Sequence, residues 1–153
     1  MIEEFKLHPS DVQPDVELAA AITGQFKIGD DPIKVYSDWE RPTNGLPDDF
    51  FTVYINGDVA GLSMDTPYAE GYLMVSLYCK MNDNGSVKKN RIKKILSQFD
   101  NKIDGLTTEN YHFEYAVPQF ITPTTPNMSS GYSITTLNLR WKTTSNFGKN
   151  LNS

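Results

Sequence analysis

Side chains able to do chemistry are few in this chain and lie far apart in its sequence. Histidine occurs only at His8 and His112, and neither has a carboxylate or a cysteine at the spacing of metal ligands. The single cysteine, Cys79, alternates with apolar residues, which indicates a packed thiol rather than a nucleophile. We therefore expect no catalytic residue, no metal, no cofactor and no enzyme activity.

Two pairs of neighbouring acids could in principle serve acid–base catalysis. The pairs are Asp30-Asp31 and Asp48-Asp49, and flanking Pro and Gly residues favour solvent-exposed loops for both. The segment 82–85 superficially resembles part of a calcium loop, but Lys80 and Arg91 stand where that loop requires carboxylates. An enzyme would need a cleft that joins a histidine to acids distant in the sequence.

A basic run from Lys88 to Lys94 falls at the start of an expected helix. Its cations could contact nucleic-acid phosphates. Alternatively, they occupy the solvent side of an amphipathic helix, which is favoured because no aromatic platform lies on the same helix face. The formal net charge of -5 also argues against attraction to nucleic acid or anionic membranes.

The composition is that of a globular domain of common size. The chain has 153 residues, of which 39% are hydrophobic and 22% charged. No stretch approaches the roughly 20 apolar residues of a membrane helix, and residues 1–5 show no apolar signal region. We expect a soluble protein made in a cytoplasm, with one α+β domain at residues 1–142 and a flexible tail at residues 143–153.

The central element is a strand followed by a helix. Residues 72–80 alternate as in a half-buried strand, residues 82–85 form a turn, and residues 90–103 form a helix. The apolar positions that repeat with the helical period are Ile92, Ile95, Leu96, Phe99 and Ile103.

Shorter elements flank this unit. A helix is expected within residues 10–24, and Asn56-Gly57 predicts a hairpin turn between strands 50–55 and 59–63. Further strands are expected at 33–36, 111–117 and 132–141, the last with a β-bulge between Ile134 and Leu137, and residues 118–130 are expected to form a long loop. This order predicts an α+β fold, a mostly antiparallel sheet of about five strands with two helices packed on one face.

The second face of the central strand is a candidate interaction surface. If Leu73, Val75 and Leu77 face the helices, the opposite face carries Tyr72, Met74 and Tyr78, and tyrosine and methionine are common where proteins meet. Alternatively, the chain's own loops cover this face. The predicted subunit interface consists of Tyr72, Met74, Tyr78, Thr122, Thr124, Thr125 and Met128.

In the order, length and general residue pattern of its elements, the chain resembles the tail terminator and tail-completion proteins of long-tailed bacteriophages, which are head–tail joining or neck proteins. The resemblance covers most of residues 10–142. The comparable segments are the strands 50–55 and 73–78, the helix 90–103, and the strands 111–117 and 132–141, with Gly131-Tyr132-Ser133 entering the last strand.

The resemblance implies a structural virion protein without catalytic residues. Such proteins form an oligomeric ring, usually of six copies, that caps the tail tube and joins it to the head connector. The implied partners are further copies of the chain and the neighbouring tail-tube and head-connector proteins, with DNA only passing through the lumen and no membrane involved. The protein would be assembled in the host cytoplasm and located in the virion. The alternatives are another phage or prophage virion component, such as a head-closure or tail-tube protein, or a small bacterial ligand-binding module.

Overall fold

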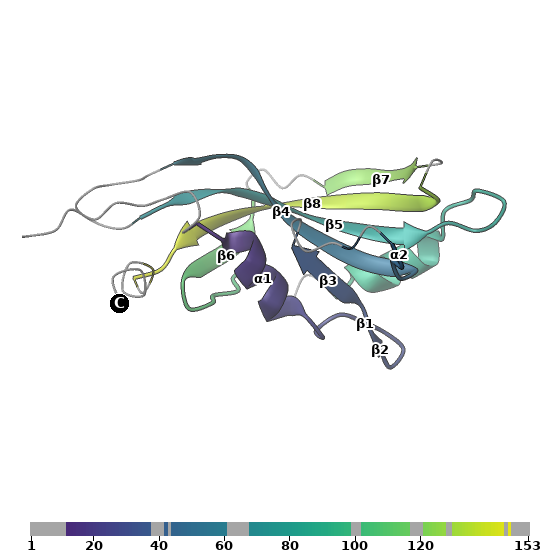
Figure 1. Ribbon diagram of the computed structural model, residues 1–153, viewed down its shortest axis with the longest axis horizontal. Helices are drawn as coiled ribbons and strands as arrows, with labels where there is room; N and C mark the ends of the chain where they lie inside the picture. Colours follow the sequence, from purple (N-terminus) through teal and green to yellow (C-terminus); the bar gives the residue numbers. More distant parts are fainter. Residues whose placement is uncertain are drawn as a thin grey trace, which may run out of the picture.

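The computed structural model describes residues 12–37, 42, 44–60, 68–98, 102–116, 121–127, 130–145 and 147. In these residues, two helices lie on one face of a six-stranded sheet, and a small two-stranded hairpin lies beside it (Figure 1). The predicted α+β fold is confirmed. The sheet has six strands rather than about five, and one of its pairs is parallel.

The sheet is built around β5 (Glu70–Lys80), which pairs antiparallel with β4 (Asp49–Ala60) and β8 (Tyr132–Thr143). On the outer side of β4 lies β3 (Lys34–Ser37), in parallel. β6 (Tyr111–Tyr115) and β7 (Ile121–Asn127) pair with successive parts of β8, so together they form one edge of the sheet.

The first helix, α1 (Pro14–Ile22), begins with proline in its first turn, where the missing N–H costs no hydrogen bond. Its buried side chains include Leu18, Ala19 and Ile22, and it packs on β3 and β4. The hairpin of β1 (Lys27–Ile28) and β2 (Asp31–Pro32) then leads the chain into β3.

The second helix, α2 (Lys89–Leu96), buries Ile92 and Ile95 as the periodicity predicts. The helix ends earlier than the expected residue 103. Gln98 Nε2 donates hydrogen bonds to the carbonyls of Lys94 and Lys27, so the chain is tied to β1 where the helix stops. Phe99 lies outside the described residues, and Ile103 is buried in the turn that follows.

Asn56-Gly57 does not form the predicted hairpin turn. β4 continues through both residues as one strand, and the pairing with β5 steps from Asn56–Tyr72 to Ala60–Glu70, which leaves extra residues on β4. Gly57 has a φ of 80°, a conformation that serves a β-bulge as well as a tight turn. The prediction was wrong because an Asn-Gly pair in the sequence is compatible with a β-bulge as well as with a tight hairpin turn.

The predicted loop at residues 118–130 contains β7, a strand paired with β8. Pro123 and Pro126 are compatible with this position because an edge strand has one side without ladder partners. The expected β-bulge is also displaced. β8 pairs regularly with β5 across Ile134 and Leu137, whereas β7 shifts register between Thr122 and Thr125.

The folded part of the domain extends beyond the predicted boundary at Lys142. Strand β8 includes Thr143, and the N–H of Thr144 donates to the carbonyl of Asn110. Phe147 is only 2% exposed, and its ring centroid lies 5.6 Å from that of Tyr111. The described residues of the expected flexible tail therefore belong to the packed domain.

Candidate interaction surface

The alternation of β5 divides the sheet into two faces. Leu73, Val75, Leu77 and Cys79 are buried on the face that the helices cover, as predicted. Because directly paired residues of antiparallel strands point to the same side, the other face follows from the register. We call it the outer face and define it by Phe50, Thr52, Tyr54, Tyr72, Met74, Ser76, Tyr78, Tyr132, Ile134, Thr136, Asn138 and Arg140.

One end of the outer face is a cluster of aromatic rings. Phe50 stacks on Tyr78 with centroids 4.8 Å apart and planes 7° apart. The ring centroids of Tyr36 and Tyr132 lie 5.9 and 5.4 Å from that of Phe50, in T-shaped arrangements. These contacts leave Phe50 only 1% exposed, although neither helix covers it.

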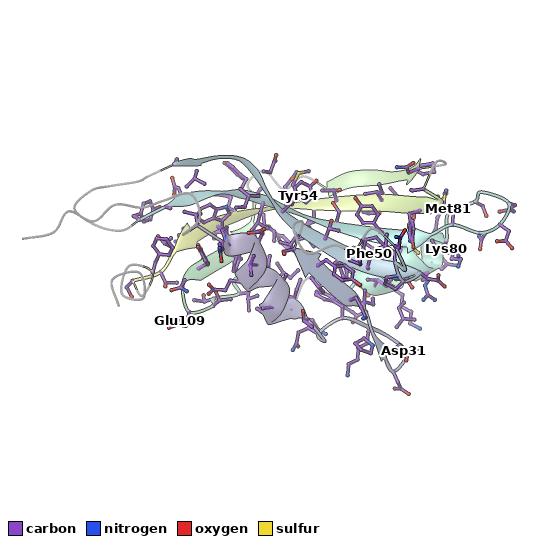
Figure 2. All side chains as sticks on the ribbon, in the orientation of Figure 1. Asp31, Phe50, Tyr54, Lys80, Met81 and Glu109 are labelled. Atoms are coloured by element: carbon purple, nitrogen blue, oxygen red, sulfur yellow. The ribbon has the colours of Figure 1, made fainter. Side chains whose placement is uncertain are left out.

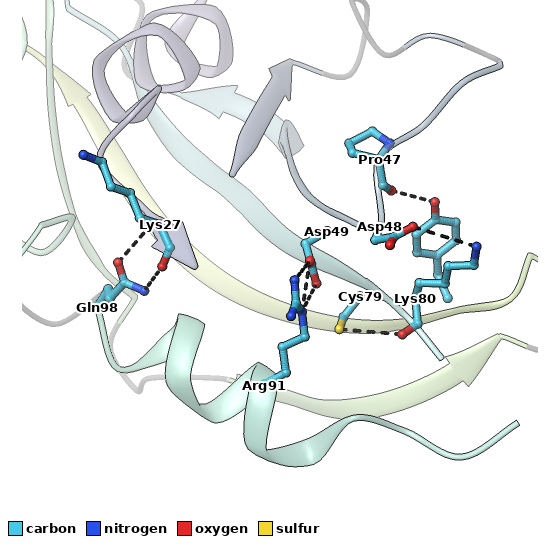
Figure 3. A network of polar contacts seen from close by, with 9 residues as sticks. Lys27, Pro47, Asp48, Asp49, Cys79, Lys80, Arg91 and Gln98 are labelled. Atoms are coloured by element: carbon cyan, nitrogen blue, oxygen red, sulfur yellow. Dashed lines mark hydrogen bonds and ion pairs between the residues drawn. The ribbon is translucent and has the colours of Figure 1, made fainter. Parts of the chain in front are cut away.

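The chain's own loop closes this aromatic end. The Tyr132 hydroxyl donates to the carbonyl of Pro47 at 2.7 Å, and Lys80 forms an exposed ion pair with Asp48 at 3.8 Å (Figure 3). Burial, with the nearby charges of Asp48 and Asp49, raises the pKa of Tyr132 above its ordinary value. The alternative in which loops cover part of this face is therefore correct for the aromatic end.

The middle of the outer face is a buried band of hydroxyl groups. The oxygens of Ser76 and Thr136 lie 2.8 Å apart and share a hydrogen bond. Beside them, Asn138 Oδ1 is buried and has no hydrogen-bond partner in the described part of the chain. Such unpaired oxygens are uncommon inside proteins.

The other end of the outer face is exposed. Tyr72 is 49% exposed, and it is the only exposed large hydrophobic side chain in the described residues. Its register partners are Asn56 and Arg140, and Met74 follows two residues along β5. Figure 2 shows Phe50 and Tyr54, the labelled members of this face, on the same strand, with Phe50 toward the end where Lys80 lies.

The predicted interface residues do not all share this surface. Tyr72, Met74 and Tyr78 lie on the outer face. Thr124 instead bonds to Thr135, which pairs with Leu77 and belongs to the helix-covered face. Thr122 and Thr125 lie in β7, but their side chains, like all of Met128, are outside the described residues.

Among the described residues considered for chemistry, His112 lies apart from Cys79, because His112 pairs with Lys142 and Cys79 with Ser133, at opposite ends of β8. His112 Nδ1 lies 2.7 Å from the Thr107 hydroxyl, and His8 is outside the described residues. His112 lines a shallow depression with Glu114, Arg140, Trp141 and Lys142, which has room for about one water molecule. Within the described residues, no group of three or more His, Cys, Asp or Glu side chains could hold a metal.

At the end of the helix-covered face, Asp49 is bound by Arg91 of α2. The Arg91 Nε lies 3.0 Å from both carboxylate oxygens of Asp49 (Figure 3). Cys79 is buried beside them, and burial, followed by the influence of Asp49, raises the pKa of its thiol to about 12. The thiol is therefore neutral and packed, as the sequence indicated.

The comparisons with known proteins give no assignment. No protein-family model matches the chain. A search of curated proteins also finds no match. Within the described residues, none of the helices has the length and apolar character needed to span a membrane.

Proposed function

We propose that the protein is a structural subunit that acts by self-association, and that it serves as a tail terminator or neck protein of a long-tailed bacteriophage. In this role, about six copies form a ring that caps the tail tube and contacts the head connector, while DNA passes through the lumen. The resemblance in the order of elements supplies the biological setting. The exposed end of the outer face supplies the physical basis for association.

The observation that carries the proposal is the environment of Tyr72. A large ring stands half-exposed on the sheet, with Met74 on the same strand and Arg140 beside it. Tyrosine, methionine and arginine are enriched in protein–protein interfaces, and tyrosine and arginine often contribute most of the binding energy. The backbone below is fixed, since Trp141 Nε1 donates to the Tyr72 carbonyl at 3.3 Å.

Size-exclusion chromatography with light scattering, followed by electron microscopy, tests the proposal. We expect the wild-type protein to form rings, or to associate increasingly as its concentration rises. Tyr72→Ala should weaken association about tenfold or more, because it removes the central ring of the contact. Its free energy of unfolding as a monomer should change little.

Leu106→Ala is the matched control. Leu106 is partly buried and packs against the core, so its truncation should lower stability without weakening association. A wild-type protein that stays monomeric at every concentration would contradict the proposed function. Neighbouring genes for portal, tape-measure or tube proteins would support the virion role, and their absence would count against it.

A further inference from the structure

Positive charge is concentrated in one segment of this acidic chain. Residues 84–98 contain five Lys or Arg side chains and no Asp or Glu, although the formal net charge of the whole chain is -5. This segment forms the turn before α2, the helix itself and the two residues that follow it. The net charge therefore describes the chain as a whole, whereas α2 carries a local excess of positive charge.

The cations of α2 that remain on its surface are three lysines. We define the basic face of α2 by Lys89, Lys93 and Lys94, which are all exposed. They take the solvent side of the helix because its apolar side is buried against the core. Arg91 does not belong to this face, since it binds Asp49 and its charge is compensated there. Lys89 and Lys93 are separated by about 6 Å along the helix axis, so each can reach a different anionic group.

The positive charge continues beyond both ends of the basic face. At the start of α2, the side chain of the N-cap residue Lys88 can only donate hydrogen bonds, so it adds to the positive end of the helix dipole instead of capping it. At the other end, Gln98 accepts a hydrogen bond from the Lys27 N–H at 3.1 Å and donates one to the Lys27 carbonyl at 3.0 Å (Figure 3). These two bonds fix the backbone of an exposed lysine from β1 beside the residues that follow α2.

We infer that the basic face of α2 binds the phosphate backbone of duplex DNA. A duplex carries one negative charge per roughly 1.7 Å of its axis, so several lysines along one helix can be engaged at once. Contacts to phosphates carry no sequence information, and binding is therefore independent of the base sequence. The inference goes beyond the proposed function, in which DNA passes through the ring without any side chain having to hold it.

Two other anionic partners fit the basic face less well. Proteins that bind single strands stack the bases on aromatic side chains. In the part of the chain that the structure describes, the one exposed large hydrophobic side chain is Tyr72, which lies on the outer face and not beside α2. A helix that binds a membrane surface inserts its apolar side, whereas the apolar side of α2 is already buried in the core.

Fluorescence anisotropy with a labelled duplex of mixed sequence tests the contact. The full chain carries Tyr72→Ala, so that self-association does not multiply the contacts. Adding K89Q/K93Q to this parent should weaken binding at least about tenfold at low salt, because two phosphate contacts are lost. The slope of log K against log salt concentration should also decrease in magnitude by about 2, since each lysine–phosphate contact contributes about 0.9.

K34Q/K142Q in the same parent is the matched control. Lys34 and Lys142 are exposed and lie on β3 and β8, outside α2, and their replacement changes the net charge by the same amount. This variant should bind the duplex like the parent, and circular dichroism should show that every variant is folded. Equal weakening by both double variants would show that net charge, and not the basic face, governs binding, and would overturn the inference.

The outcomes for the inference and for the proposed function are distinguishable. If the wild type forms rings but neither it nor the Tyr72→Ala parent binds the duplex at low salt, the inference is wrong and the proposed function stands. If the duplex binds through Lys89 and Lys93 while the wild type stays monomeric, the inference stands and the proposed function fails. Tighter binding to a single strand of DNA, or to phosphatidylserine vesicles, than to the duplex would assign the basic face to that partner and overturn the inference.

Discussion

The two faces of the central sheet differ in their side chains and in what covers them. On the helix-covered face, Leu73, Val75 and Leu77 are buried beneath α1 and α2 in a continuous apolar core. On the outer face, aromatic rings, hydroxyl groups and an exposed tyrosine follow one another along the same strand. β5 contributes to both faces residue by residue, so one strand faces the apolar core on one side and carries the proposed contact surface on the other.

Exposure also changes along the outer face itself. Tyr78 stacks on Phe50 under the loop at Pro47, whereas Tyr72 at the other end stands exposed. Truncating Tyr78 would therefore disturb the fold as well as any contact. Tyr72 is the better probe of association, because its side chain can be removed without opening a buried cluster.

The largest effect on stability is expected when Phe51 is truncated. Its neighbour Phe50, on the opposite face of the sheet, provides the comparison. Phe51 is fully buried on the helix-covered face, and its ring centroid lies 5.1 Å from that of Phe26. Phe51→Ala should lower the free energy of unfolding by about 3–5 kcal/mol, since helices and sheet cannot close around the cavity. Urea denaturation measures this change.

Phe50→Ala is the comparison on the outer face. Phe50 is equally buried, but the surrounding rings of Tyr36, Tyr78 and Tyr132 are only partly buried and can shift into the space. We expect a loss at least about 1 kcal/mol smaller than for Phe51→Ala, because the cost of a cavity depends on how far its site can collapse. Equal losses would mean that the outer face is packed as rigidly as the core.

A smaller effect is expected at the hydroxyl band. Thr136→Val removes one partner of the hydrogen bond with Ser76, which is 2% exposed, and should cost about 1–3 kcal/mol. The double variant Ser76→Ala/Thr136→Val leaves no orphaned hydroxyl and should be closer to wild type. A double-mutant cycle by urea denaturation measures the coupling. Additive losses would show that water already reaches this band.

Local patterns in the sequence predicted the elements whose structure depends on nearby residues. The alternation of Leu73, Val75 and Leu77 gave the correct buried face of β5, and the helical spacing of Ile92 and Ile95 gave the buried side of α2. Gly57 was misinterpreted because its positive φ suits both a hairpin turn and a bulge. Only pairing with β5 distinguishes the two structures.

The residues of the candidate surface were also predictable only in part from the sequence. Alternation alone placed Tyr72 and Met74 on the outer face. Thr124 was assigned to the surface because its Pro- and Thr-rich segment suggested a loop, whereas the strand β7 turns it toward Thr135. The stacking of Phe50 on Tyr78 joins residues of separate strands and depends on their register, which the sequence does not specify.

The smallest expected effect tests how well the end of the helix-covered face excludes water. Burial and Asp49 raise the pKa of Cys79 to about 12, whereas a thiol in the unfolded chain ionises near pH 8.5. This contribution to stability is therefore complete below about pH 8.5 and is lost as pH rises from there toward 12. Between about pH 8.5 and 9.5, below the ordinary range of tyrosine ionisation, the free energy of unfolding should fall more steeply for wild type than for Cys79→Ala. In the same range iodoacetamide should modify Cys79 only after urea unfolds the chain. Rapid modification of the folded protein would mean that the core opens to solvent at its Asp49 end. The helix-covered face would then exclude water less completely than its buried apolar side chains indicate.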